Sequence, residues 1–264
     1  MDSEKIKKSM RMRHQFLYGY NNEENHQFVK NLTTLYPIKF NEDADMAILL
    51  NSIGIPNVES DKQSKEDLKL KSIAREYLNL TIAYNILVKM KKDIEPSELS
   101  KRILELLSFV SVRYLDKEYP KITSIDELLI HIKYSQIMYL NEYQKYLLGY
   151  ETVKMNNIPI KFIDLSLFIN HTKRMMRNNS GFHLITPLEK DISPISVMAI
   201  NSIIATKYNR DISVEILCEP GKWPTYETLD NHKIEYVHDY GIVELDDSYE
   251  HYKKLTKRLP HTKG

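Results

Sequence analysis

Apolar residues recur at three- and four-residue steps over most of the first 150 residues, which is the spacing of helices that bury one face. In residues 66–92 this stripe contains Leu70, Ile73 and Tyr77. Ser124 and Glu127 have the spacing of a capping box at a helix start. The pattern predicts long helices over residues 66–92, 95–117 and 124–150, and shorter ones over 3–18, 23–35 and 42–51.

After Gly149 short apolar runs alternate with helical patterns. We predict two hairpins, about Asn156–Asn157 and about Gly241. The other predicted elements are a helix over 164–176, a strand near 182–186, a helix beginning at Pro194, a strand over 211–219 and a last helix from Ser248. The predicted fold class is therefore α+β and mainly α. An N-terminal helical bundle (1–150) precedes a smaller mixed α+β part (151–264) with a short sheet, and the two parts can share one core.

Composition and charge add mostly exclusions. The chain has 37 basic and 36 acidic residues, so it projects no strong long-range field toward nucleic acid or an anionic membrane. A single cysteine excludes an internal disulfide. The sequence shows neither a signal-peptide pattern nor a long apolar run, which predicts an intracellular, cytoplasmic protein with no membrane contact. Abundant Ile, Lys and Asn are typical of A/T-rich genomes, such as those of many viruses and mobile elements.

The seven glycines are dispersed along the chain. A phosphate-binding loop needs clustered glycines so that several backbone N–H groups can approach the anion. Neither a Walker-A nor a dinucleotide-binding pattern is present, so we expect no cofactor of these kinds.

The stretch "RMMRNNSGFH" contains Arg177 and His183, six positions apart. This spacing resembles that of metal-independent ribonucleases of the HEPN group, which implies a proton-transferring His183 and an Arg177 that stabilises a charged transition state. The Asn-Asn-Ser-Gly turn between them would interrupt the helix on which that chemistry depends. We therefore favour a helix end, with cationic Lys173, Arg174 and Arg177 before a glycine-containing cap.

A second catalytic alternative lies in "DISVEILCEPGK". Asp211, Glu215 and Glu219 are four residues apart on a predicted strand and can face one way. They are the candidate ligands for Mg²⁺ in a nuclease, although the lysine expected beside them has the wrong spacing.

Basic side chains form the candidate nucleic-acid surface. Those nominated are Lys173, Arg174, Lys253, Lys254, Lys257 and Arg258. Five tyrosines crowd the helix predicted over 124–150, where they can stack on bases or pack against neighbouring helices; packing or a partner interface is the favoured interpretation.

Three functions follow from these patterns. The favoured one is a non-enzymatic interaction or regulatory protein, of viral or mobile-element type, with a protein partner. The alternatives are a nucleic-acid-processing enzyme, which is either a ribonuclease or a Mg²⁺-dependent nuclease, and a nucleic-acid-binding module. The oligomeric state does not follow from the sequence.

Overall fold

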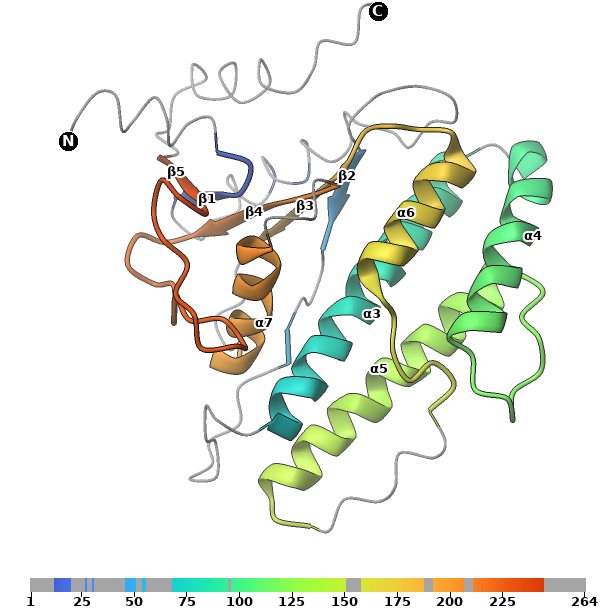
Figure 1. Ribbon diagram of the computed structural model, residues 1–264, viewed down its shortest axis with the longest axis horizontal. Coiled ribbons are helices and arrows are strands. Elements are labelled where there is room, and N and C mark those ends of the chain that lie inside the picture. The colour runs from blue at the N-terminus through green and yellow to red at the C-terminus, as the bar shows by residue number, and fades with distance from the viewer. Residues whose placement is uncertain are drawn as a thin grey trace, which may run out of the picture.

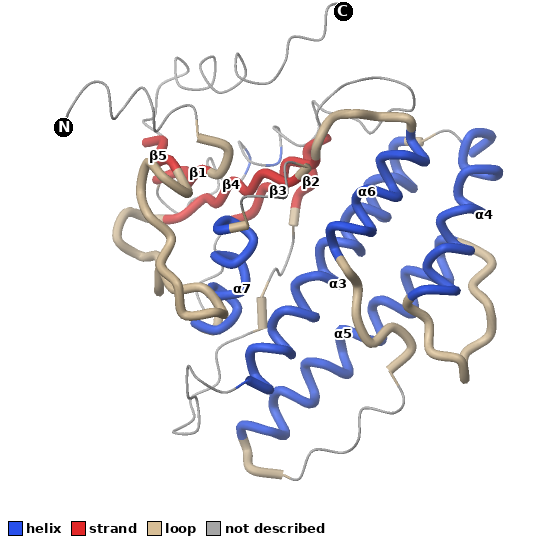
Figure 2. Tube along the Cα trace, viewed as in Figure 1, coloured by secondary structure: helices blue, strands red, loops and turns tan. Residues whose placement is uncertain are grey.

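The computed structural model describes residues 12–19, 27, 30, 46–50, 54–55, 68–94, 96–150, 158–187, 192–206 and 211–244. In this part of the chain there are five strands, which form one sheet, and five helices (Figures 1 and 2). The strands are β1 (Gln15–Tyr18), β2 (Met46–Leu49), β3 (Phe182–Pro187), β4 (Ile212–Cys218) and β5 (Gly241–Glu244). The helices are α3 (Leu68–Asp93), α4 (Pro96–Arg113), α5 (Ile125–Leu147), α6 (Leu165–Met176) and α7 (Pro194–Ala205).

All neighbouring strands of the sheet are parallel, in the order β2-β3-β4-β1-β5. In this order β1 lies between β4 and β5, β2 forms one edge, β3 and β4 fill the places from β2 to β1, and β5 forms the other edge. The connection from β2 to β3 carries α3 to α6, and these helices gather beside the β2 end of the sheet (Figure 1).

The predicted α+β fold with an N-terminal helical bundle was wrong. Residues 15–18 and 46–49, which we predicted as parts of helices, are strands of the parallel sheet. Each strand has only four residues, of which the first three are buried. A buried parallel strand is apolar on both faces. A strand of four such residues therefore lacks the two-residue alternation of apolar and polar positions that distinguishes a strand from a helix in the sequence.

The predicted hairpin about Gly241 was also wrong. Residues 241–244 pair with β1 in parallel, and residues before them form only isolated bridges, such as Glu227 with Lys233. The predicted hairpin about residues 156–157, the last helix and most of the helices over 3–18 and 23–35 lie outside the described residues.

The remaining helices and strands confirm the pattern analysis. Ser124 caps α5 by accepting a hydrogen bond from the Glu127 backbone N–H at 3.1 Å. Ser193 and Asp164 cap α7 and α6 in the same way, and Pro194 occupies the first turn of α7.

One hydrophobic cluster includes residues from both sides of residue 150. Phe16 and Ile48 of the first two strands, Val214 of β4 and Ile86 of α3 all belong to it. α3 packs on both α5 and α7 and thereby joins the sheet to the outer helices. None of the helices in the described ranges is both long and apolar enough to cross a membrane.

Candidate functional site

Arg177 ends α6. It adopts the left-handed conformation (φ 52°, ψ 40°), and its backbone N–H and that of Asn178 donate to carbonyls of the last helical turn at 3.0 Å. The helix-end interpretation of this stretch therefore matches the geometry, although Arg177 itself takes the left-handed position. Gly181 instead allows a close approach of two chain segments, because a Cβ added there would lie 2.8 Å from the backbone oxygen of Asp211.

His183 lies on β3, opposite Ser213 of β4, and the Ser213 hydroxyl and the His183 Nδ1 are hydrogen-bonded. Two residues before Ser213, Asp211 forms an ion pair with Lys173 of α6. The strand register thus brings residues from two separately predicted sites to one pair of neighbouring strands. Ser213 was not anticipated, because nothing in the sequence marks a serine within an apolar strand.

Polar side chains continue across this face of the sheet. Glu215 is aligned with Gln15 of β1 on one side and with Ile185 of β3 on the other. By strand alternation, Ser213, Glu215 and Gln15 share the face that lies opposite the main hydrophobic cluster. Buried strands of a parallel sheet are usually apolar, whereas Gln15 and Ser213 are buried polar residues, so this row is the chemically distinctive part of the sheet.

The three predicted Mg²⁺ ligands do not form one site. Asp211 precedes the first residue of β4 and Glu219 follows its last, so the two lie at opposite ends of the strand. In the described ranges, no group of three or more His, Cys, Asp or Glu side chains is placed to hold a metal ion. Cys218 is the last residue of β4. Burial raises the pKa of its thiol to about 12, so this thiol is not an activated nucleophile.

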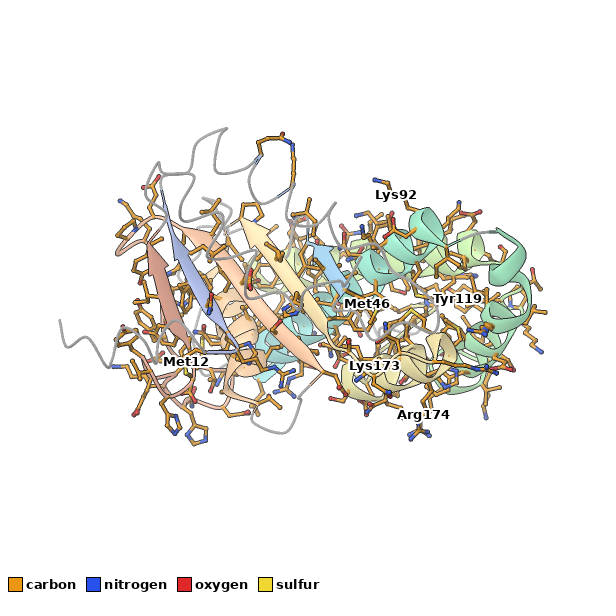
Figure 3. All side chains as sticks on the ribbon, turned by 90° about the horizontal axis from the view of Figure 1, so that it is seen from above. Met12, Met46, Lys92, Tyr119, Lys173 and Arg174 are labelled. Atoms are coloured by element: carbon orange, nitrogen blue, oxygen red, sulfur yellow. The ribbon has the colours of Figure 1, made fainter. Side chains whose placement is uncertain are left out.

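The predicted nucleic-acid-binding residues do not form one described surface. Lys173 is largely buried in its ion pair with Asp211, whereas Arg174 is exposed (Figure 3). The C-terminal lysines and arginine, Lys253, Lys254, Lys257 and Arg258, lie outside the described residues.

A row of exposed apolar side chains lies on α5. Ile130, Tyr134 and Ile137 follow one another at four- and three-residue steps and are 67%, 45% and 46% exposed. Of the predicted tyrosine cluster, Tyr139 and Tyr143 are buried, so packing explains these two and leaves Tyr134 outside.

The register between α3 and α5 extends this surface. Lys91 of α3 pairs with Asp126 of α5, and the Lys133 ammonium of α5 lies 5.7 Å from the centroid of the Tyr84 ring of α3. A later residue of α3 thus meets an earlier residue of α5, so the two helices are antiparallel. Val88, between Tyr84 and Lys91 on α3, therefore lies beside Ile130. We call Tyr84, Val88, Ile130, Tyr134 and Ile137 the α3–α5 patch.

Lysines border the α3–α5 patch. Lys133 of α5 lies beside Tyr84 of the patch. Lys92 extends from the end of α3, on the side of the molecule away from Lys173 and Arg174 in Figure 3. Within the described residues, neither Lys92 nor Lys133 has an acidic partner, whereas Lys91 is paired with Asp126. The patch is thus apolar with a basic border.

Comparisons with known proteins add no relative. No protein-family model matches the chain, and no curated protein or solved structure matches it.

Proposed function

We propose that this protein is a non-enzymatic interaction protein that binds an amphipathic helix of a protein partner on the α3–α5 patch. The observation that carries the proposal is the line of exposed Ile130, Tyr134 and Ile137 on α5, extended by Val88 of α3. Isolated exposed apolar residues are ordinary, but a contiguous row of them on packed helices is typical of a binding surface.

The shape and charge of the patch favour a helix as the occupant. A helix laid along two antiparallel helices presents apolar side chains at three- and four-residue steps, which matches the spacing on α5. Covering the exposed part of each apolar side chain contributes on the order of 1 kcal/mol. Lys92 and Lys133 favour acidic residues beside the apolar face of the partner, because opposite charges at the border of an interface speed association and select partners.

Selection from a displayed library of amphipathic helical peptides tests this proposal. We expect enriched peptides to carry apolar residues at helical spacing with acidic neighbours. Enrichment should be lost with the double variant Ile130→Lys/Ile137→Lys and kept with Leu104→Lys/Val112→Lys, which alters two exposed apolar residues of α4. Enrichment that survives the α5 change, or no enrichment at all, would reject the proposal.

A second candidate is nucleic-acid processing, which the placement of His183 favours. His183 is hydrogen-bonded to Ser213 of β4, and Asp211 lies directly before that strand. Incubation with labelled RNA and DNA, with Mg²⁺ or with chelator, tests it. Cleavage that is lost in His183→Ala and retained with exposed His232→Ala supports this candidate, and equal cleavage by both variants, or none by the parent protein, removes it.

A further inference from the structure

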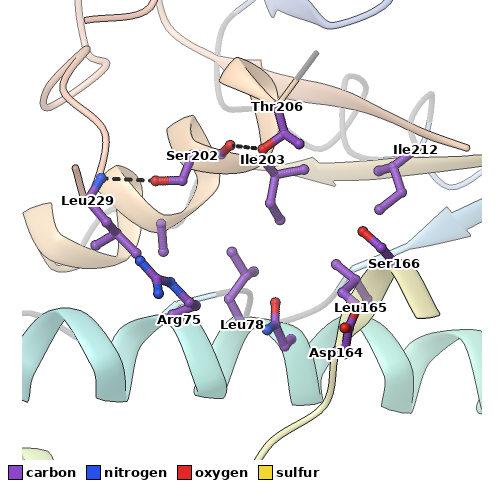
Figure 4. Close-up of a pocket in the computed structure, with 12 residues that line it drawn as sticks. Arg75, Leu78, Asp164, Leu165, Ser166, Ser202, Ile203, Thr206, Ile212 and Leu229 are labelled. Carbon is purple, nitrogen blue, oxygen red and sulfur yellow. Dashed lines mark hydrogen bonds between the residues drawn. The ribbon is translucent and has the colours of Figure 1, made fainter. Parts of the chain in front are cut away.

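A cavity of about 300 Å³ lies between α3, the start of α6 and the second half of α7 (Figure 4). Its apolar lining comes from Leu78 of α3, Ala199 and Ile203 of α7 and Ile212 at the start of β4. The size is at the lower end of the range for small-molecule sites, which are mostly apolar with a few polar groups that orient the ligand.

Most neutral polar groups of the cavity already bind the backbone. The Asn79 amide donates to the Ile163 carbonyl at 3.1 Å, and the Thr206 hydroxyl donates to the Ser202 carbonyl at 2.6 Å. The Ser202 hydroxyl donates to the Met198 carbonyl and accepts from the Leu229 N–H, both at 2.9 Å. These contacts commit the donors of the cavity wall to the fold and leave the charged groups to orient a ligand.

Two opposite charges remain, on different walls. Arg75 of α3 has one long contact, 3.8 Å to exposed Asp230, and its guanidinium has further donors available. Asp164 caps α6 by accepting the Leu167 N–H at 2.9 Å on Oδ1, and its second carboxylate oxygen can accept another hydrogen bond. Figure 4 shows Leu78 between them in the view drawn.

We infer that this cavity binds a small zwitterion with an apolar body, of the class of a free aliphatic α-amino acid. Arg75 would bind its carboxylate, Asp164 its ammonium, and the apolar lining its side chain. A ligand with one charge would leave either Arg75 or Asp164 facing an unmatched or like charge, so the pair selects for both groups together.

Three probes of one shape separate the contributions. Leucine carries both charges, 3-methylbutylamine lacks the carboxylate and 4-methylpentanoate lacks the ammonium. Calorimetric titration of the full chain should show leucine binding at least about tenfold more tightly than either analogue. Arg75→Gln should remove the preference for leucine over the amine, and Asp164→Asn should remove the preference over the acid. Asparagine is a good helix cap, so Asp164→Asn keeps α6 intact.

A change of volume provides the matched control. Ala199→Leu fills the cavity without altering a charge and should abolish leucine binding; Ala199→Val serves if the larger residue prevents folding. Lys91→Gln, which removes an exposed charge of α3 outside the cavity, should leave binding unchanged. The inference is overturned if leucine does not bind at about 10 mM, if the three probes bind alike, or if binding survives filling of the cavity.

Discussion

Protonation of His14 should destabilise the fold in mild acid. His14 is buried directly before β1, and its Nδ1 accepts a hydrogen bond from the Val214 backbone N–H at 3.1 Å. Burial, followed by the nearby charge of Arg13, lowers the pKa of His14 from 6.5 to about 4. Between these two pH values the unfolded chain binds a proton at this site that the folded chain does not. The stability is therefore complete above pH 6.5 and is lost as the pH falls toward 4.

The size of the effect follows from that difference. At about 1.4 kcal/mol per pKa unit, the full loss is about 3 kcal/mol, of which about 2 kcal/mol is reached near pH 5. His14→Asn is the matched variant, because the asparagine Oδ1 can accept the same hydrogen bond and does not titrate. Between about pH 7.5 and about pH 5, the free energy of unfolding of the parent protein should fall by about 2 kcal/mol more than that of His14→Asn.

Urea unfolding, followed by the fluorescence of Trp223, measures this difference, because Trp223 is the single tryptophan and is buried against Phe16. Other titrating groups act equally in the two proteins and cancel in the comparison. An equal loss of stability in both proteins would refute the assignment of a buried, neutral His14 that accepts the Val214 N–H.

Two further predictions use the same unfolding assay. Burial raises the pKa of Glu76 to about 7, so the contribution of Glu76 to stability is complete below pH 4.5 and is lost as the pH rises through 7. Glu76→Gln should remove this pH dependence of the free energy of unfolding, and an unchanged pH profile in the variant would contradict the prediction. Gly181→Ala should cost about 1–3 kcal/mol, because the new Cβ would lie 2.8 Å from the Asp211 backbone oxygen, and an unaltered urea midpoint would contradict that close approach.

The long helices were predictable because their signals are long and local. The stripe of α3 extends over 26 residues, and the Ser124 cap and Pro194 mark helix starts by their own chemistry. The strands β1 and β2 were not predictable in this way. Each is four residues long, and its stabilising partners are strands far away in the chain: β1 pairs with β4 and β5, and β2 with β3.

The candidate sites show the same limit. His183 and Asp211 were recognisable as chemically capable residues. Only the register of β3 and β4 reveals that Ser213 lies opposite His183, two residues after Asp211. The tyrosines of α5 were recognisable as a group. Which of them are buried depends on the packing of α5 against the rest of the fold, which buries Tyr139 and leaves Tyr134 exposed.

The affinity of one selected helical peptide for two double variants tests the central claim most directly. Fluorescence anisotropy with a labelled peptide gives the Kd for Ile130→Lys/Ile137→Lys and for Leu104→Lys/Val112→Lys. Both variants change two exposed apolar side chains to lysine, so their effects on charge and solubility are matched. We predict that the α5 change weakens binding by at least about tenfold, or about 1.4 kcal/mol, and that the α4 change leaves it within about twofold of the parent protein. Equal affinities for the two variants would contradict an interaction surface on α3 and α5.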